Sequence, residues 1–372
     1  MKNKILAPFA LVLLLFLVAC SGKQENKGYD HYVKVSIDNP ETFNLSDVAD
    51  SCFMVPLKSA DGVVIGEIKE VFLIDSLIIV WDSKSENLLV YNQSGDYLYQ
   101  IGRKGEASEE YVYLTNVKID SENKINISDV SMQRIIRYDL RGNYISSMTM
   151  NNPFTNFLPV ESGFWGITSF SNKYNLTLVD REGQNEIKTY FYSEESIPLG
   201  KVNNFSTDEK GDIIFYVTYK DVIYKIEGEE LVPFVEIDFG QKKPEDINTE
   251  EFRTFFHDGS YLGAISNVHF YKNKLFFSFA DFKGMGKPYN SYRVFVDFNT
   301  SEKKSVIYID GKHFDNVPVD PIPEIVSLTD NKLVYQIVPD MYPEAAIEKI
   351  REYFPDISSD SEPILVFYNL KD

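Results

Sequence analysis

Short apolar stretches alternate with polar turns along the chain from about residue 32 onward. The apolar stretches are rich in Val, Ile, Phe and Tyr, and turn-forming residues separate them at intervals of roughly 8–12 residues. Few segments show the three-to-four-residue spacing of an amphipathic helix. The pattern therefore predicts an all-β protein.

One phrase of this pattern occurs twice. The stretch that begins at Leu88 reads LLVYNQSGDYL, and the stretch that begins at Ile135 reads IIRYDLRGNYI. Each copy is an apolar strand, a turn with Gly, and a second strand. Self-similarity over roughly 40–50 residues, with strands alone, is typical of β-propeller blades. We therefore predict a six-bladed β-propeller of four-stranded antiparallel blades, with blades at 68–101, 115–148, 157–191, 202–237, 265–308 and 324–368.

The sixth predicted blade has one strand too few, although a propeller must close its ring to avoid unpaired sheet edges. A strand from the N-terminal part of the chain is the expected solution. Tyr32–Ile37 alternates and is the first candidate, and we expect it to pair antiparallel with Ile364–Tyr368. Cys52–Leu57 is a second segment that could contribute.

Two insertions interrupt the blades, at residues 241–264 and 339–362. In the first, Asn248–Glu251 has the composition of a helix N-cap, and in the second Pro343 suits a first helical position. Each insertion is expected to hold a short helix. The helices either cover blade edges or rise together to shape a binding mouth.

The first residues have the features of an export signal. Lys2 and Lys4 precede an apolar run from residue 5 to residue 19 that is too short to span a membrane comfortably. The run ends Leu17-Val18-Ala19-Cys20, which resembles the bacterial lipobox, although an ordinary signal peptide is the alternative. We predict a lipoprotein signal peptide over 1–19, a lipidated tether over 20–31 that begins at Cys20, and a propeller domain over 32–372.

The predicted lipid anchor places the protein in the cell envelope. Two acyl chains hold a protein stably on a membrane, and Ser21 is compatible with sorting to the outer membrane. The side that the protein faces, periplasm or cell surface, stays open. With Cys20 lipidated, Cys52 has no disulfide partner and is expected to be a buried apolar residue.

The formal net charge of −19 is an argument against electrostatic binding of nucleic acid or anionic lipid headgroups. It is also the charge expected of a soluble secreted surface. The membrane contact should therefore come through the N-terminal lipid alone.

Two further segments carry a family resemblance. Residues 53–68 include FMVPLK and VIGEI, which resemble the segment that leads into the first blade of six-bladed β-propeller lipoproteins of Bacteroidota. The stretch IGRKGE, followed by EEY at 109–111, is similar to a loop of that family, with Ala107-Ser108-Glu109 in place of Gly-Pro-Gly. The blades also look like NHL repeats. The resemblance implies a six-bladed propeller and export, and it implies no reaction.

No motif identifies catalytic or metal-binding residues. Asp82 and Asp129 follow the second strands of the first two blades, where they are expected to accept hydrogen bonds from turn amides instead of binding metal. The four histidines lack metal-ligand spacing. We therefore assign no catalytic residue, no metal and no cofactor.

Aromatic residues in predicted loops are the remaining candidates for a site. Exposed rings suit stacking on sugars or docking to a partner, and otherwise they pack beneath their own loops. The candidate ligand-binding residues are Phe255, Phe256, Tyr261, Phe282, Tyr289 and Tyr292. Asp258 and Asp281 could accept hydrogen bonds beside them.

Two functions remain open at this point. The first is a tethered binding or scaffold module for a glycan, a peptide or a protein partner such as an outer-membrane complex. The alternative is a lactonase-type hydrolase with Ca²⁺ in the central channel. The fold alone does not decide between them.

Overall fold

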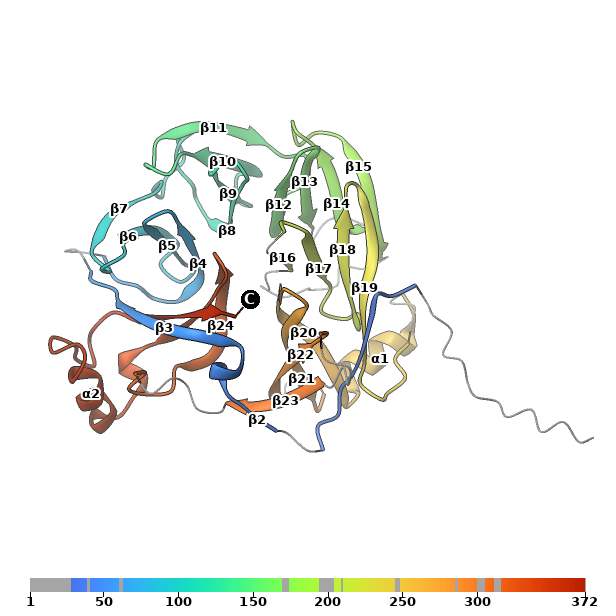
Figure 1. Ribbon diagram of the computed structural model, residues 1–372. Helices are drawn as coiled ribbons and strands as arrows, with labels where there is room; N and C mark the ends of the chain where they lie inside the picture. The colour runs from blue at the N-terminus through green and yellow to red at the C-terminus, as the bar shows by residue number, and fades with distance from the viewer. Residues whose placement is uncertain are drawn as a thin grey trace, which may run out of the picture.

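The chain folds into a ring of six β-sheets (Figure 1). The computed structural model describes residues 28–38, 41–59, 63–168, 174–193, 204–208, 210–244, 248–284, 287–299, 305–310 and 316–371. The predicted leader and Cys20 lie outside these residues. The ring itself confirms the predicted six-bladed propeller.

Each blade is an antiparallel sheet whose strands follow one another from the centre of the ring outward. Blade one contains β4 (Ile68–Ile74), β5 (Leu77–Asp82), β6 (Asn87–Asn92) and β7 (Tyr97–Gln100). Blade two contains β8 (Leu114–Ile119), β9 (Ile125–Asp129), β10 (Arg134–Tyr138) and β11 (Tyr144–Thr149). Blade three contains β12 (Asn156–Val160), β13 (Gly163–Ile167), β14 (Tyr174–Asp180) and β15 (Glu186–Tyr192). The repeated phrase of the sequence is the hairpin of the third and fourth strands, β6–β7 and β10–β11.

Blades four and five carry an extra strand on their outer edges. Blade four contains β16 (Phe205–Thr207), β17 (Ile213–Tyr216), β18 (Val222–Glu227) and β19 (Glu230–Asp238), and β1 (His31–Lys34) pairs parallel with β19. Blade five contains β20 (Tyr261–Tyr271), β21 (Lys274–Phe282), β22 (Asn290–Asp297) and β23 (Ser305–Asp310), and β2 (Glu41–Phe43) pairs parallel with β23.

An N-terminal strand closes the ring, as predicted, but it is not the expected one. Blade six contains β24 (Ile322–Thr329), β25 (Lys332–Ile337), β26 (Ile364–Leu370) and, as its outer strand, β3 (Ala49–Pro56). The prediction that Tyr32–Ile37 pairs with Ile364–Tyr368 is wrong, because β3 holds that position in antiparallel register. The second candidate, Cys52–Leu57, overlaps the strand that closes the ring.

The reason lies in chain order and in burial. Chain leaving β3 enters β4, so blade six connects to blade one from outer to inner strand, as β7 connects to β8. The alternating residues of the first candidate are buried elsewhere, since Val33 and Val35 pack into the apolar cluster between blades four and five. An alternating strand buries one set of side chains whether it pairs in parallel with β19 or antiparallel with β26. The alternation alone therefore does not identify the partner strand.

The apolar core is divided among the interfaces between blades. Six clusters of buried side chains occur among the described residues, and each joins two neighbouring blades. Val90 of blade one and Ile127 of blade two, for example, share one cluster. Because both faces of a blade are covered, its middle strands are almost continuously apolar, as in the sequence LIIVWD of β5. The blades therefore hold one another in place around the centre.

Buried aspartates fix the loops that lead into the inner strands. The Asp82 carboxylate accepts four backbone hydrogen bonds, at 2.7–3.1 Å, from the N–H groups of Gly66, Glu67, Lys84 and Ser85. Asp129 accepts equivalent bonds from Val112 at 2.8 Å and Met132 at 3.2 Å. Both aspartates therefore satisfy turn amides, as predicted.

The two insertions form the predicted short helices, but the helices do not meet. Helix α1 (Glu250–Asp258) begins after Thr249, whose side chain accepts the Phe252 N–H at 3.2 Å, and it packs through Phe252 against Tyr219 of blade four. Helix α2 (Glu344–Arg351) buries its apolar stripe in the cluster of blades five and six. Figure 1 shows them at separate edges of the ring, so the expectation of a shared mouth is wrong. Short 3₁₀ turns lie at η1 (Leu45–Asp47) and η2 (Pro339–Met341).

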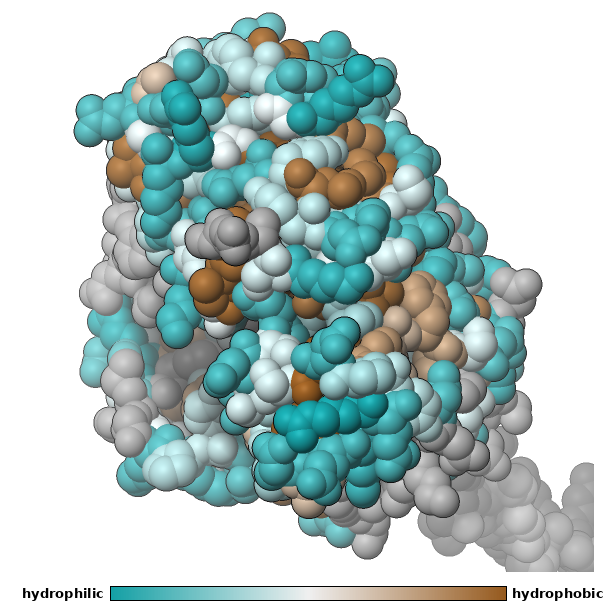
Figure 2. Space-filling view, turned by 90° about the vertical axis from the view of Figure 1, so that its left-hand side faces the viewer, coloured by the Kyte–Doolittle hydropathy of each residue, from teal (hydrophilic) through white to brown (hydrophobic). Residues whose placement is uncertain are grey.

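In the described part of the chain, neither helix has the length and apolar character that crossing a membrane requires. The face of the molecule in Figure 2 is mainly hydrophilic, and its apolar residues form small separate groups. This surface agrees with the acidic composition of the chain.

Candidate functional site

Four of the six predicted aromatic residues form one continuous column of rings at blade five. The ring centroids are 5.1 Å apart between Phe255 and Tyr261, 4.9 Å between Tyr261 and Phe282, and 5.2 Å between Phe282 and Tyr289. Tyr261 and Phe282 are direct cross-strand partners of β20 and β21, which explains their stacking. We call this set the aromatic column.

The rings of the column differ in exposure. Tyr261 is 4% exposed, whereas Tyr289 is 58% exposed and is the outermost ring. Phe282 is half-buried between these two rings, and Phe255, at the other end of the column, is half-buried as well. Tyr289 is therefore the ring of the column that is most accessible to a ligand.

A buried ion pair supports the buried ring of the column, Tyr261. The Lys243 ammonium lies 5.6 Å from the Tyr261 ring centroid and 5.2 Å from that of Phe239, and it contacts the Asp221 carboxylate at 2.5 Å. Burial lowers the pKa of Lys243 and raises that of Asp221, while the attraction between the two charges opposes both shifts. This arrangement holds Tyr261 rigidly, since cation–π contacts strengthen when water is excluded.

The other predicted site residues do not join the column in the described structure. Tyr292 is half-buried and stacks on Phe279 at 5.3 Å, within the core of blades four and five. Asp281 is buried and contacts the Lys283 ammonium at 2.8 Å. The side chains of Phe256 and Asp258 lie outside what the structure describes.

A second candidate site is the central channel, which from the sequence was a candidate only for the Ca²⁺ site of a hydrolase. It contains a cavity of about 660 Å³, lined by residues from the inner strand of every blade. This volume lies within the range of roughly 300–1,000 Å³ that is common for small-molecule sites.

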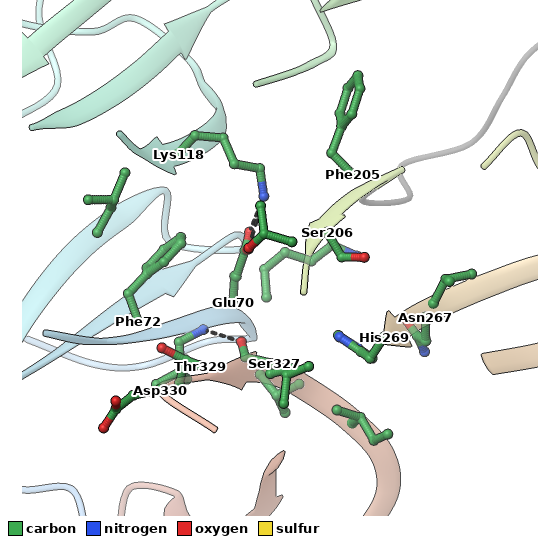
Figure 3. Close-up of a pocket in the computed structure, with 18 of the residues that line it drawn as sticks. Glu70, Phe72, Lys118, Phe205, Ser206, Asn267, His269, Ser327, Thr329 and Asp330 are labelled. Atoms are coloured by element: carbon green, nitrogen blue, oxygen red, sulfur yellow. Dashed lines mark hydrogen bonds and ion pairs between the residues drawn. The ribbon is translucent and has the colours of Figure 1, made fainter. Parts of the chain in front are cut away.

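One side of the cavity carries a buried ion pair. The Lys118 ammonium donates to both Glu70 oxygens, at 2.9 and 3.1 Å, and so joins the inner strands of blades one and two (Figure 3). Beside it, the Val71 N–H donates to Ser327 Oγ at 2.7 Å, which joins blades one and six. The charges on this side therefore neutralise each other, and its polar groups connect blades.

The opposite side is shaped by an irregular inner strand. The pairing of β20 with β21 shifts register twice, and Ala264 and Asn267 adopt φ of 54° and 49°, in the left-handed region. Bulges of this kind redirect side chains and are common beside functional sites. Figure 3 shows Asn267 and His269 on this strand, with the imidazole directed toward Lys118 and Glu70.

His269 is uncharged at neutral pH. Burial, assisted by the nearby Lys118 charge, lowers its pKa from 6.5 to about 4. A base with so low a pKa is poorly matched to proton transfer near pH 7. The imidazole is therefore suited to hydrogen bonding, as a neutral donor and acceptor.

Among the described residues, no group of three or more His, Cys, Asp or Glu side chains is placed to hold a metal ion. Cys52 is half-buried, not fully buried as expected, and its thiol donates to Asn316 Oδ1 at 3.1 Å. Burial raises the pKa of this thiol, which keeps it protonated and weakly nucleophilic.

The sequence profile of a family described as "Domain of unknown function (DUF4934)" matches residues 30–369. The chain belongs to this family. No curated protein sequence matches it.

Two solved structures share the fold. One is named "Putative exported protein" from Bacteroides fragilis, with 16% identity, a TM-score of 0.72, and coverage of 92% of this chain and 99% of the other. The second is a member of the duf4221 family from Bacteroides vulgatus, with 10% identity, a TM-score of 0.53, and coverage of 87% and 97%. At these identities the likeness shows the fold alone. It agrees with the predicted propeller fold.

Sequence reasoning missed the polar residues of the channel. The sequence pattern predicts only a strand at Asn267 and His269. The one role weighed for His269 is that of a metal ligand, for which the histidines lack the spacing. The available signal was the polar cluster Ser266-Asn267 and His269 in an otherwise apolar inner strand. Which face of that strand meets the channel depends on the bulges, which no residue pattern specifies.

Proposed function

We infer that the protein is an exported, membrane-tethered binding module that takes its ligand on the outer end of the aromatic column. The single observation that carries this inference is the exposed Tyr289 ring, stacked on a column that contains the buried Tyr261 ring. The ligand is a glycan, a peptide or a protein partner that presents a flat face to this ring.

The physical support is preorganisation. A lone exposed tyrosine loses rotamer freedom when it binds, whereas a ring already seated on Phe282 loses less. Stacked rings contribute roughly 0.5–1.5 kcal/mol beyond the burial of their area. The column therefore offers a rigid platform for a sugar ring or an aromatic side chain.

Export and tethering rest on other features. The segment Leu17-Val18-Ala19-Cys20 supports lipidation at Cys20, and the name of the Bacteroides fragilis protein with the same fold supports export. The residue after the cysteine, Ser21, is compatible with an outer-membrane location. The net charge of −19 keeps nucleic acid out of the set of partners.

The hydrolase alternative requires several carboxylates and amides that converge on Ca²⁺ in the channel. Carboxylates and amides do line the channel, but within the described residues no three or more His, Cys, Asp or Glu side chains are grouped so that they could hold a metal ion. The binding module is therefore the better supported of the two functions.

The test is a Tyr289→Ala variant of the full-length protein. Binding is measured with chitohexaose, xylohexaose, mannohexaose and a Trp-containing hexapeptide, and the melting temperature is measured in parallel. We expect affinity to fall on the order of tenfold with the melting temperature unchanged, because the ring is 58% exposed.

Two further variants make the test specific. Tyr353→Ala removes another exposed tyrosine, 45% exposed, and should leave binding unchanged. Tyr261→Ala should lower the melting temperature, because that ring is buried. Binding that survives Tyr289→Ala at full strength contradicts the proposal.

A further inference from the structure

The central channel holds three polar side chains that the fold itself does not use. Ser206 of blade four has a buried hydroxyl without a hydrogen-bond partner in the described structure. In the same part of the chain, the side chains of Asn267 and His269 of blade five make no hydrogen bond to a protein group. The inner strands β16 and β20 contact each other, so the three groups line one side of the cavity.

Leaving the Ser206 hydroxyl without a partner is costly, at about 1–3 kcal/mol for a buried donor or acceptor, whereas Asn267 and His269 are half-buried and present their polar groups to the cavity. Here the backbone is also held in the left-handed region at Ala264 and Asn267, next to the groups concerned. Strain of this kind persists where the surrounding structure enforces it, and it gathers at ligand sites. The unpaired Ser206 hydroxyl on β16 and the strained backbone of β20 are independent observations on two neighbouring inner strands, and both point to the same side of the cavity.

The charges around the cavity restrict the ligand. The Lys118 charge is matched by both oxygens of Glu70, so this pair has no net charge to offer. Acids outnumber cations among the remaining charged residues of the lining, which are Glu67, Asp208, Glu324 and Asp330 against Lys69. Acids there disfavour an anionic ligand.

We propose that the channel is a second binding site, distinct from the aromatic column, and that it takes a small uncharged polyhydroxy compound such as a monosaccharide. Hydroxyl groups both donate and accept, which matches a hydroxyl, an amide and a neutral imidazole on one side of the cavity. Half-buried Phe72 lines the same cavity and offers an apolar surface to the carbon face of a sugar. The cavity volume of about 660 Å³ gives room for such a molecule.

The experiment uses the full-length protein in a detergent without a sugar headgroup. Titration calorimetry and saturation-transfer NMR compare uncharged sugars (D-glucose, D-galactose and N-acetyl-D-glucosamine) with anionic D-glucuronate and cationic D-glucosamine. We expect at least one uncharged sugar to bind, and to bind more tightly than its charged counterparts.

The decisive variant is Asn267→Gly. It removes the amide, and glycine adopts a positive φ without strain, so the fold is retained or stabilised while affinity falls about five- to tenfold. His269→Gln should weaken binding to a similar degree. The control is Asn123→Gly, another asparagine at positive φ (58°), which lies in an exposed turn of blade two and should bind as the wild type does.

Tyr289→Ala separates this proposal from the column. Channel binding should be unaffected by it, so the two sites can fail independently. The channel proposal is overturned if no uncharged sugar binds, if a charged sugar binds more tightly, or if Asn267→Gly and His269→Gln bind with wild-type affinity. It is also overturned if sugar binding is lost in Tyr289→Ala but kept in Asn267→Gly.

Discussion

Single residues in this propeller adopt conformations that local preference opposes. Ala264 has no side-chain group to compensate a φ of 54°, and Asn267 follows at 49°. Each costs on the order of 1–3 kcal/mol. The long pairing of β20 with β21 and the cluster between blades four and five hold them there. What the strand gains is the direction of Asn267 and His269 into the channel.

The neutral state of His269 gives the protein a defined pH dependence. Its pKa is about 4 in the folded state and about 6.5 in the unfolded chain. Between these values the unfolded chain binds a proton that the folded chain does not, so stability falls as the pH drops from 6.5 toward 4. Urea denaturation at pH 7.0, 5.5 and 4.5 should show this loss.

The His269→Gln variant isolates the effect, because glutamine does not titrate. Its unfolding free energy should change less between pH 7.0 and 4.5 than that of the wild type. The Asp120 carboxylate, whose pKa lies below its ordinary value because Lys124 N–H, Asn126 and Arg137 donate to it, acts only at lower pH. An identical slope for the variant and the wild type over this window contradicts the assignment.

Residue patterns identified which loop aromatics lie near blade five but did not predict how exposed each ring is. Loop aromatics near blade five were identified, and Phe255, Tyr261, Phe282 and Tyr289 do come together. Yet Tyr261 is buried and Tyr292 belongs to the core, because burial depends on which strand faces which blade. A ring in a loop looks the same in sequence whether a neighbouring blade covers it or not.

At the scale of elements, three N-terminal strands add to the outer edges of three successive blades. Strand β1 joins blade four, β2 joins blade five, and β3 completes blade six. The first two pair in parallel and the third in antiparallel register. The blade strands could be predicted from their periodicity, but the pairing of these three could not, since an alternating strand fits any open edge.

The different roles of β1 and β3 lead to different mutant phenotypes. Val33 is fully buried against blade four and Val55 is 4% exposed within the blade that closes the ring. Val33→Asp should release β1 and make the chain before residue 38 sensitive to protease, with the main unfolding transition retained. Val55→Asp should lower that transition itself, because a buried charge opens the junction of the last and first blades.

Limited proteolysis and differential scanning calorimetry measure the two effects side by side. If Val33→Asp unfolds the whole ring at the same temperature as Val55→Asp, β1 is an integral part of the propeller and the distinction fails.

At the scale of the whole molecule, an acidic chain would be joined to the proposed N-terminal anchor. Chain that precedes β1 leaves the ring beside blade four (Figure 1). The tether would therefore attach at the edge of the ring, with the aromatic column in the adjacent blade five. A ligand held by the column would then lie at the same edge of the ring as the proposed tether.

We predict that Cys20 is the first residue of the mature protein and that it carries lipid. Mass spectrometry of the protein purified from native membranes should find an acylated N-terminal peptide beginning at Cys20. A Cys20→Ser variant should lose this modification and fractionate without detergent. An N-terminus at another residue, or full solubility of the wild type without detergent, contradicts the prediction.

The placement of the N-terminal strands also constrains when the protein can fold. His31 pairs with Val235, Glu41 with Tyr308, and Val55 with Leu365. The earliest strands to be synthesised thus wait for partners made in the second half of translation, and contacts so distant in sequence form slowly. An incomplete chain therefore cannot close the ring, and it cannot become trapped in the cytoplasm as a folded domain. In a chain that is exported as proposed, this order of strands would delay closure of the ring and so favour passage of the unfolded polypeptide through a secretion channel.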